Sequence, residues 1–268
     1  MHASTPSSTM TRSGSTPPAL RARGLSKSYR SPVLDNLDLD IEQGQFVAIM
    51  GPSGSGKSTL LHCLSGMDRP SAGSILLGDT EITSLSEKEL AALRLTRFGF
   101  VFQQAHLMPT LCLLDNIVLP GYLAGLRPRP EITARGEELM ERMGISEQAA
   151  SGVTEVSGGQ LQRAGICRAL INDPGIVFAD EPTGNLDSRT TEQVLAVLRS
   201  AVDDFAQSVV MVTHEADAAA WADTVLFLRD GRLVAQMDAP DRDRILAALH
   251  DLGSAGGWGS AARKEALS

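Results

Sequence analysis

The sequence predicts an α/β fold built around a mainly parallel central sheet. Three apolar runs, FVAIMG at 46–51, GIVFAD at 175–180 and SVVMVTH at 208–214, have the length and continuity of strands that are covered on both faces. Between the last two runs, apolar residues recur at helical spacing, which predicts the crossover helix that two parallel strands need. These residues are Val194, Val197, Leu198, Ala201 and Phe205.

Two other segments complete this outline. TVLFLRDGRLV at 224–234 places Asp230-Gly231 between alternating apolar residues, which is typical of a β-hairpin near the end of a domain. Residues 86 to about 170 show mainly helical patterns, with only FGFVFQ at 98–103 typical of a strand. We therefore predict a helical insert within the α/β domain.

Composition limits the classes of function. The chain has 268 residues, 43% hydrophobic and 21% charged, which is enough for one soluble domain with a sizeable core. The net charge of -8 disfavours a broad nucleic-acid-binding face, so we expect no nucleic acid partner. No run of about 18 apolar residues is present, and the N-terminus lacks the apolar region of a secretion signal.

The predicted organisation has three parts. Residues 1–18 are rich in Ser, Thr and Pro and are expected to form a disordered arm, residues 19–240 form the main domain, and residues 241–268 form a short helix and a flexible tail. Cys63, Cys112 and Cys167 lack metal-ligand spacing. We interpret them as buried thiols of a reducing compartment.

The segment GPSGSGKST at 51–59 fits the phosphate-loop pattern G-x-x-x-x-G-K-[ST] between a strand and a helix. Glycines let the backbone wrap a polyphosphate, the lysine reaches the outer phosphates, and the serine hydroxyl can bind Mg²⁺. A glycine-rich turn that merely ends a strand would not need Lys and Ser in this register. The pattern predicts a P-loop NTPase core, and alone it leaves kinases, GTPases and motors open. The predicted nucleotide-binding residues are Gly51, Pro52, Ser53, Gly54, Ser55, Gly56, Lys57, Ser58 and Thr59.

Asp180 and Glu181 end the second apolar run. This places two carboxylates at the C-terminal edge of a buried strand, where open α/β sheets bind ligands. Asp180 is suited to holding Mg²⁺, and Glu181 is suited to polarising the attacking water. An ordinary Asp-Glu turn is the alternative, and the phosphate loop in the same chain disfavours it.

The motifs together resemble the nucleotide-binding subunit of an ABC transporter over roughly residues 20–237. All six occur in the order of that family, and the joint match is far more specific than any single motif. They are GPSGSGKST, FVFQQ at 100–104, VSGGQ at 156–160, FADEP at 178–182, GNLD at 184–187 and VTHE at 212–215. The resemblance implies an N-terminal antiparallel β part and a helical insert that carries the signature motif. It also implies ATP as substrate and Mg²⁺ as cofactor.

The resemblance also implies a role for each matched residue. Tyr29 would stack on adenine, with core packing as the alternative, and Gln103 would sense Mg²⁺ and the attacking water. His214 would hold the γ-phosphate. The implied catalytic residues are Glu181, His214, Gln103 and Lys57, and the implied metal ligands are Ser58, Gln103 and Asp180. Val156 and Gly165 depart from the usual residues of the signature segment.

In this family two subunits face each other head to tail around two ATP molecules. The signature segment of one copy then serves the ATP held by the phosphate loop of the other, and so a second copy of this chain is an expected partner. The residues that would act across this interface are Ser157, Gly158, Gly159, Gln160 and Asp187.

GFVFQQAHLMPTLCLLDNIVLP at 99–120 is similar to ATPases of the lipoprotein-release, macrolide-export and antimicrobial-peptide-resistance subgroup. The resemblance implies a transmembrane permease as partner, and a cytoplasmic location on the inner face of the membrane. Phe102, Leu107, Met108 and Leu111 are candidate permease contacts, and core packing explains each of them equally well. About 54 residues follow His214, which favours export or lipid extraction over sugar uptake.

Other functions stay open at this stage. An ABC ATPase can transmit a signal or force across a membrane without transport. A soluble, non-transport ABC ATPase is a second alternative, although forms that act on DNA separate the two phosphate-binding motifs by long coiled coils, whereas Lys57 and Ser157 are about 100 residues apart here. A module that binds ATP without hydrolysing it is disfavoured by Glu181.

Overall fold

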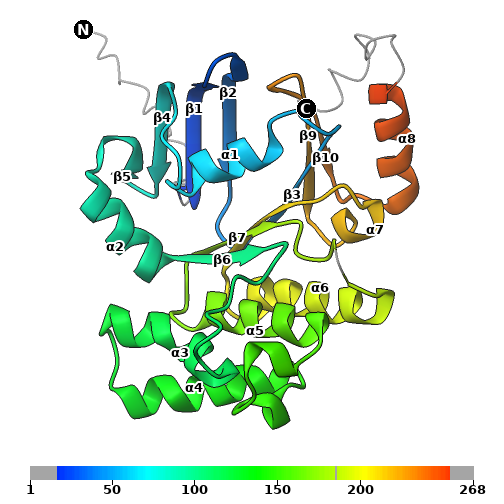
Figure 1. The fold of residues 1–268 in the computed structure, drawn as a ribbon. Helices are drawn as coiled ribbons and strands as arrows, with labels where there is room; N and C mark the ends of the chain where they lie inside the picture. The colour runs from blue at the N-terminus through cyan, green and yellow to red at the C-terminus, as the bar shows by residue number, and fades with distance from the viewer. Residues whose placement is uncertain (1–16, 185, 254–268) are drawn as a thin grey trace, which may run out of the picture.

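A computed structural model describes residues 17–184 and 186–253, which form two sheets and a layer of helices (Figure 1). The predicted disordered arm, apart from residues 17 and 18, and the predicted tail beyond residue 253 lie outside the described residues. The strands are β1 (Leu20–Ser28), β2 (Pro32–Ile41), β3 (Phe46–Met50), β4 (Ala72–Leu77), β5 (Thr80–Glu81), β6 (Phe98–Phe102), β7 (Ile176–Asp180), β8 (Ser208–Val212), β9 (Thr224–Arg229) and β10 (Arg232–Asp238). The helices are α1 (Lys57–Leu64), α2 (Glu87–Arg97), α3 (Leu113–Ala124), α4 (Arg129–Arg142), α5 (Gly158–Leu170), α6 (Ser188–Asp203), α7 (Ala216–Ala219) and α8 (Arg242–Gly253).

The central sheet has the strand order β10-β9-β3-β8-β7-β6. All pairs are parallel except the hairpin of β9 and β10, whose turn holds Asp230-Gly231. Side chains alternate along a strand, so β3 directs Phe46, Ala48 and Met50 into one core, whereas Val47 and Ile49 enter the other. Burial on both faces explains the continuous apolar runs of the sequence.

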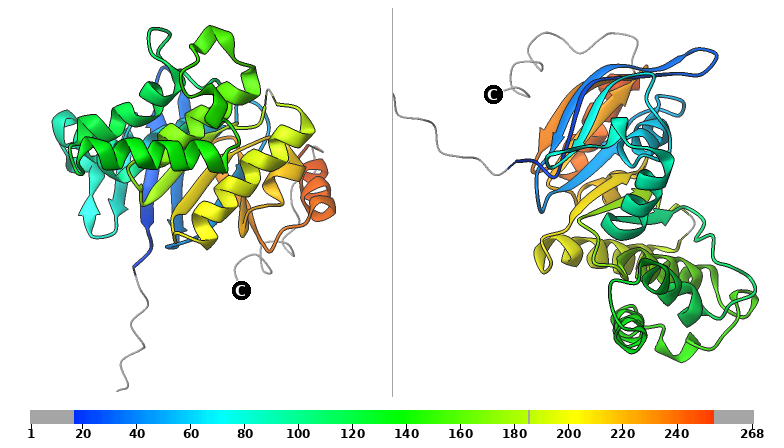
Figure 2. Two further views of the ribbon diagram at one scale, coloured as in Figure 1. Left: turned by 90° about the horizontal axis from the view of Figure 1, so that it is seen from below. Right: turned by 90° about the vertical axis from the view of Figure 1, so that its left-hand side faces the viewer.

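The second sheet is antiparallel, in the order β2-β1-β4-β5. Together with α1 it covers one face of the central sheet, and α3, α5 and α6 cover the other (Figures 1 and 2). The predicted fold class is therefore confirmed, with the mainly parallel sheet, the N-terminal antiparallel part and the helical segment that carries VSGGQ.

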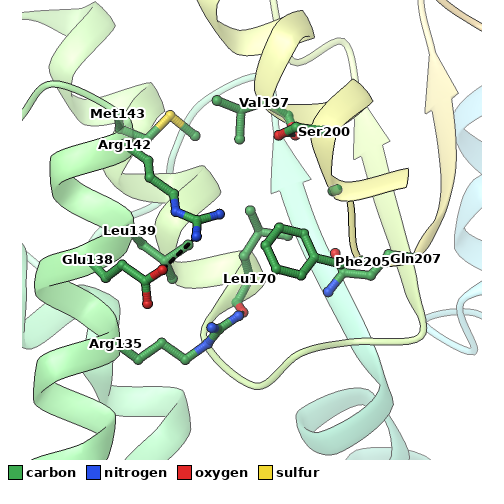
Figure 3. A pocket seen from close by; sticks show the side chains of 11 residues that line it. Arg135, Glu138, Leu139, Arg142, Met143, Leu170, Val197, Ser200, Phe205 and Gln207 are labelled. Atoms are coloured by element: carbon green, nitrogen blue, oxygen red, sulfur yellow. Dashed lines mark hydrogen bonds and ion pairs between the residues drawn. The ribbon is translucent and has the colours of Figure 1, made fainter. Parts of the chain in front are cut away.

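The crossover helix α6 differs from the prediction at its end. Val194, Leu198 and Ala201 are buried as expected, but the helix ends at Asp203 and Phe205 lies beyond it with 47% of its surface exposed. The prediction that Phe205 continues the apolar stripe is wrong. Its ring instead lies 5.2 Å from the guanidinium carbon of Arg142, beside a hollow next to α4 (Figure 3).

The three cysteines are free thiols. Cys63 and Cys167 are buried, and burial raises the pKa of the Cys63 thiol to about 11, so it stays protonated near neutral pH. Cys112 is half-buried instead of buried, and its sulfur accepts a hydrogen bond from Asp115 N at the start of α3. Within residues 17–184 and 186–253, no helix combines the length and apolar character needed to cross a membrane.

Candidate functional site

Four adjacent parallel strands deliver the candidate residues to one edge of the central sheet. The order β3-β8-β7-β6 places the end of β3 beside β8, and the end of β7 between β8 and β6. The phosphate-loop segment follows β3, and His214 comes two residues after β8. Glu181 follows β7, and Gln103 follows β6. Because carboxyl ends of parallel strands meet at one edge, residues far apart in sequence share this region.

The loop 51–56 has a backbone that only glycine fits at two positions. Gly51 has φ 154°, and a Cβ atom there would lie 2.0 Å from the carbonyl oxygen of Leu228. Gly56, the N-cap of α1, has φ 103°, and a Cβ atom would lie 2.9 Å from Leu34 Cδ2. The loop therefore follows a tight path that leads directly into a helix N-terminus, where free N–H groups and the helix dipole attract anions.

Lys57 begins α1 and turns back over the loop. Its Nζ donates to the carbonyl oxygens of Gly51 at 2.9 Å and Pro52 at 3.0 Å. Burial lowers the pKa of Lys57, and the charges of Glu181 and Asp180 oppose that effect. In the remainder of the motif Ser55 is buried, Gly56, Lys57 and Thr59 are half-buried, and Pro52, Ser53, Gly54 and Ser58 are exposed.

Ser58 and Asp180 form a pair that fits a hard cation. Ser58 Oγ donates to Asp180 Oδ1 at 3.2 Å, which joins α1 to the end of β7. Partial burial raises the pKa of Asp180, and the hydrogen bond from Ser58 opposes the rise. Hydroxyl and carboxylate oxygens are ligands that Mg²⁺ prefers, and it commonly takes only one or two protein groups beside substrate phosphates.

Glu181 lies between the other polar residues of this edge. His214 Nδ1 is 3.2 Å from Glu181 Oε1, and Glu181 N donates to Val212 O at 2.9 Å. A Cβ atom on Gly184 would lie 3.1 Å from Gln103 Nε2 and 3.6 Å from Glu181 Oε2. The amide of Gln103 and the carboxylate of Glu181 thus lie on the same small surface, next to His214.

The signature segment begins α5 at a well-capped N-terminus. Ser157 is the N-cap, Gln160 N donates to Ser157 Oγ at 3.3 Å, and Ser157 N donates to Gln160 Oε1 at 2.8 Å. Ser157 and Gly158 are exposed, and a Cβ atom on Gly158 would meet nothing within 4 Å. This capping box uses two donors of the first turn and leaves the open side of the helix end accessible.

Asp187 is the N-cap of α6, the position that Ser157 occupies in α5. Its carboxylate accepts hydrogen bonds from Thr190 N at 3.0 Å and Thr190 Oγ1 at 2.7 Å. These bonds lower the pKa of Asp187, so it is an exposed anion at neutral pH. Thr190 also lies against the signature segment, since a Cβ atom on Gly159 would be 3.2 Å from Thr190 Cγ2.

Tyr29 is 61% exposed, so the core-packing interpretation is wrong. Its hydroxyl donates to Asp68 Oδ2, and this bond raises the pKa of Tyr29. Lys27 Nζ lies 4.7 Å from the ring centroid and forms an ion pair with Asp68 at 2.6 Å. The ring is thus held at its hydroxyl end and presents an open aromatic surface, which suits stacking on a planar ligand.

A groove of 420 Å³ lies along the edge strand β6, between α2 and the helices α3 and α5. Phe102 and His106 line it, and their rings meet edge to face with centroids 5.5 Å apart. Leu107 is 9% exposed and belongs to the core, so its prediction as a surface contact is wrong. Leu111 is half-buried, and Met108 is 48% exposed. The other lining residues are Met67, Arg94, Leu95, Phe98, Phe100, Pro120, Arg168, Ala169 and Asn172.

Two buried contacts at this edge were not predicted. Thr183 Oγ1, in a residue that is 2% exposed, donates to Glu215 Oε2 at 3.0 Å. Gln162, 4% exposed, donates to Phe102 O and Pro182 O. Each residue stands within a few positions of a recognised motif, and this proximity is the signal that could have found them.

A smaller hollow of 40 Å³ lies between α4, the end of α6 and the segment before β8 (Figure 3). Leu139, Leu170 and Phe205 provide apolar walls, and Gln207 lies beside the Phe205 ring. At about 10–15 Å³ per water, the space admits about three water molecules and no nucleotide.

The chain is similar to proteins of one family over most of its length. The family model described as ABC transporter matches residues 34–184. The chain is 45% identical over 223 residues to the macrolide export ATP-binding/permease protein MacB 1/2 of Paracoccus denitrificans, covering 81% of this chain and 33% of that protein. The chain therefore spans about a third of the first curated relatives it matches.

Two shorter relatives are matched along nearly their whole length. Identity is 41% to the bacitracin export ATP-binding protein BceA of Halalkalibacterium halodurans, covering 84% of this chain and 90% of that protein. It is also 41% to the lipoprotein-releasing system ATP-binding protein LolD of Aquifex aeolicus, covering 81% and 97%. The dimeric ATP-binding cassette MJ0796, solved in a post-hydrolysis state with ADP and Pi, superposes with a TM-score of 0.78 at 34% identity, covering 83% of this chain and 99% of that one.

Proposed function

This chain belongs to the ABC transporter family as an ATP-binding cassette, and we propose that it hydrolyses ATP to drive a membrane permease. The observation that carries this proposal is the edge at which four adjacent parallel strands bring the phosphate loop, His214, Glu181 and Gln103 together. A cassette that only bound nucleotide would not need a carboxylate and an imidazole next to the position of the γ-phosphate.

Each group has a task that its position supports. The loop N–H groups and Lys57 bind the phosphates, and Glu181 takes up the proton of the attacking water. His214, whose Nδ1 donates to the Glu181 carboxylate, orients that carboxylate, and with both ring nitrogens protonated its Nε2 would also donate to the γ-phosphate. Tyr29 stacks on the adenine. Ser58, Asp180 and Gln103 would hold Mg²⁺, which when bound neutralises charge on the phosphate oxygens.

We further propose that the working form is a head-to-tail dimer with ATP at both interfaces. The exposed N-terminus of α5 supports this, because capped Ser157 and open Gly158 present a helix end to solvent and not to the phosphate loop of the same chain. In the dimer this helix end binds the γ-phosphate held by the other copy. Asp187, the N-cap of α6 and a bond partner of Thr190, which lies against Gly159, would lie at the same interface.

The groove of 420 Å³ is the proposed contact for the permease. Its apolar lining includes Phe102, which directly precedes Gln103, so docking there could be transmitted to the site. The relatives in macrolide export, bacitracin export and lipoprotein release support export or extraction of a lipid, lipoprotein, peptide or drug as the class of work. The chain would then lie on the cytoplasmic face of the membrane through its permease.

The dimer is tested with the Glu181→Gln variant, which should bind ATP without hydrolysing it. Size-exclusion chromatography with light scattering should show a dimer with ATP and a monomer without it. Adding Ser157→Arg should return the protein to a monomer, because the bulky cation blocks the helix end. An ATP-dependent dimer that persists in the double variant would contradict the proposed arrangement.

A further inference from the structure

Gln162 is a buried glutamine of α5 that ties two catalytic segments together. Its Nε2 donates to Phe102 O at 2.8 Å and to Pro182 O at 2.9 Å, so both hydrogens of the amide are used. Phe102 precedes Gln103, and Pro182 follows Glu181. One side chain thus holds the backbone where β6 and β7 end.

The same face of α5 also contacts residues 105 and 106, which follow Gln103 in the chain. Gly165 and Arg168 follow Gln162 at intervals of three residues, so the three share a face. Arg168 donates to Ala105 O at 2.6 Å and to His106 O at 2.8 Å. A Cβ atom on Gly165 would lie 3.2 Å from Ala105 Cβ. The departure to glycine at position 165 therefore permits close approach of the helix to this segment.

We infer that Gln162 is a positioning residue that couples the two ATP sites, and this inference rests on the proposed function. The N-terminus of the same helix carries Ser157, which would serve the ATP of the partner copy, whereas Gln103 and Glu181 serve the ATP of their own copy. Gln162 fixes the position of the α5 N-terminus, with Ser157, relative to Gln103 and Glu181. Binding of ATP at one interface of the dimer thereby changes the positions of the catalytic groups at the other interface.

The backbone around Glu181 explains why such a link is needed. Glu181 has φ 47°, a conformation that non-glycine residues rarely adopt and that surrounding contacts must maintain. Its own N–H donates to Val212 O, its own carbonyl accepts from Gly184 N at 3.2 Å, and the carbonyl of the following residue, Pro182, accepts from Gln162. These three bonds hold the strained residue and the peptide that follows it, and the bond from Gln162 is the one made by a side chain. Without the Gln162 bond, the Pro182 carbonyl loses its fixed position while β7 itself remains intact.

The test compares variants that keep volume and lose the hydrogen bonds. In the full-length chain we expect Gln162→Met to keep the KM for ATP within about twofold and to lower kcat by roughly tenfold or more, because small displacements of catalytic groups cost rate and not binding. Gln162→Leu is a second variant in case methionine packs poorly. Gln207→Met is the matched control, since Gln207 is also buried, at 6% exposure, and its side-chain oxygen has no hydrogen-bond partner in the described part of the chain.

A second measurement is independent of turnover. Without nucleotide, hydrogen exchange should accelerate in peptides covering 102–106 and 181–184 of Gln162→Met, and stay unchanged there in Gln207→Met. Unchanged exchange together with wild-type kcat would overturn the inference, as would an equal loss of kcat in the control. If the wild-type chain failed to hydrolyse ATP while the exchange difference persisted, the proposed function would fall and the positioning role of Gln162 would stand.

Discussion

Nδ1 of His214 lies 3.2 Å from Oε1 of Glu181, across the boundary between two neighbouring strands. Glu181 follows β7 and His214 follows β8, and the pairing of Asp180 with Val212 fixes how far each projects beyond the sheet. The side chain of Glu181 is 27% exposed and that of His214 is 59% exposed, so a ligand can reach both. In the proposed function, the pair would combine a base and its orienting group at a site that a ligand can reach.

The first prediction separates chemistry from binding. Glu181→Gln should bind ATP as tightly as the wild type and lower turnover by about 10²- to 10⁴-fold, because the amide cannot accept the proton of water. Phosphate release and equilibrium binding of a fluorescent ATP analogue measure the two effects. Lys57→Ala should instead weaken binding. Release of phosphate by Glu181→Gln near the wild-type rate would remove Glu181 from the role of base.

The relationship between Glu181 and His214 extends that prediction. If His214 acts partly by orienting Glu181, then His214→Ala should cost much less turnover in the Glu181→Gln background than in the wild type. Full additivity of the two losses would indicate independent roles.

The second prediction concerns Tyr29. Replacing the ring by Tyr29→Ala should raise the KM for ATP by roughly 5- to 150-fold, which corresponds to about 1–3 kcal/mol of stacking on a base. Tyr29→Phe is the matched control, because it keeps the ring and loses only the bond to Asp68. An unchanged KM in the alanine variant would show that adenine binds elsewhere.

Sequence alone could predict the sheet and the candidate site at its edge because both follow from local patterns. A parallel strand buried on both faces must be apolar throughout. For this reason β3, β7 and β8 can be recognised in the sequence as continuous apolar runs. Asp180 and Glu181 then stand at the ends of runs, so their place at the sheet edge follows from the strand direction. Family resemblance supplied the roles that strand ends alone do not give.

Other features depended on tertiary contacts that no local pattern records. Phe205 keeps the helical spacing of α6, but the helix ends before it, and Ala206 then turns into the left-handed region with φ 53°. Leu107 is surrounded by core residues, although its sequence neighbours are exposed. Gln162 stands two residues after VSGGQ, but its contacts could not be predicted because its two acceptors are 60 and 20 residues away.

The third prediction uses the raised pKa of Asp180, which results mainly from burial. A carboxyl whose pKa is raised in the folded state contributes stability that is lost as pH rises above its ordinary value of 3.8. Asp180→Asn should therefore unfold at a higher urea concentration than the wild type near pH 7, and this difference should shrink toward pH 4. Asp180→Asn should also lose ATPase activity, so the substitution would raise stability and abolish function.

The control for this series is Asp187→Asn. Bonds from Thr190 lower the pKa of Asp187, so its contribution to stability is present above the ordinary pKa and is lost as pH falls. Asp187→Asn should therefore not unfold at a higher urea concentration than the wild type at pH 7, in contrast to Asp180→Asn. A gain of stability in both variants would point to a general effect of reducing the negative charge.

The last prediction tests the groove as the permease contact, with a surface residue in place of the buried Leu107. Met67 lines the groove and is 39% exposed, so Met67→Glu should leave the fold and ATP binding intact. Desolvating a carboxylate in an interface costs several kcal/mol, which the neighbouring Arg94 offsets only in part, and co-purification with the co-expressed permease should be lost. Met108→Glu is the matched control, because Met108 is 48% exposed and lies outside the groove lining. If Met108→Glu disrupted the complex and Met67→Glu did not, the permease would dock on the outer side of segment 104–111, and the groove would lose its proposed role.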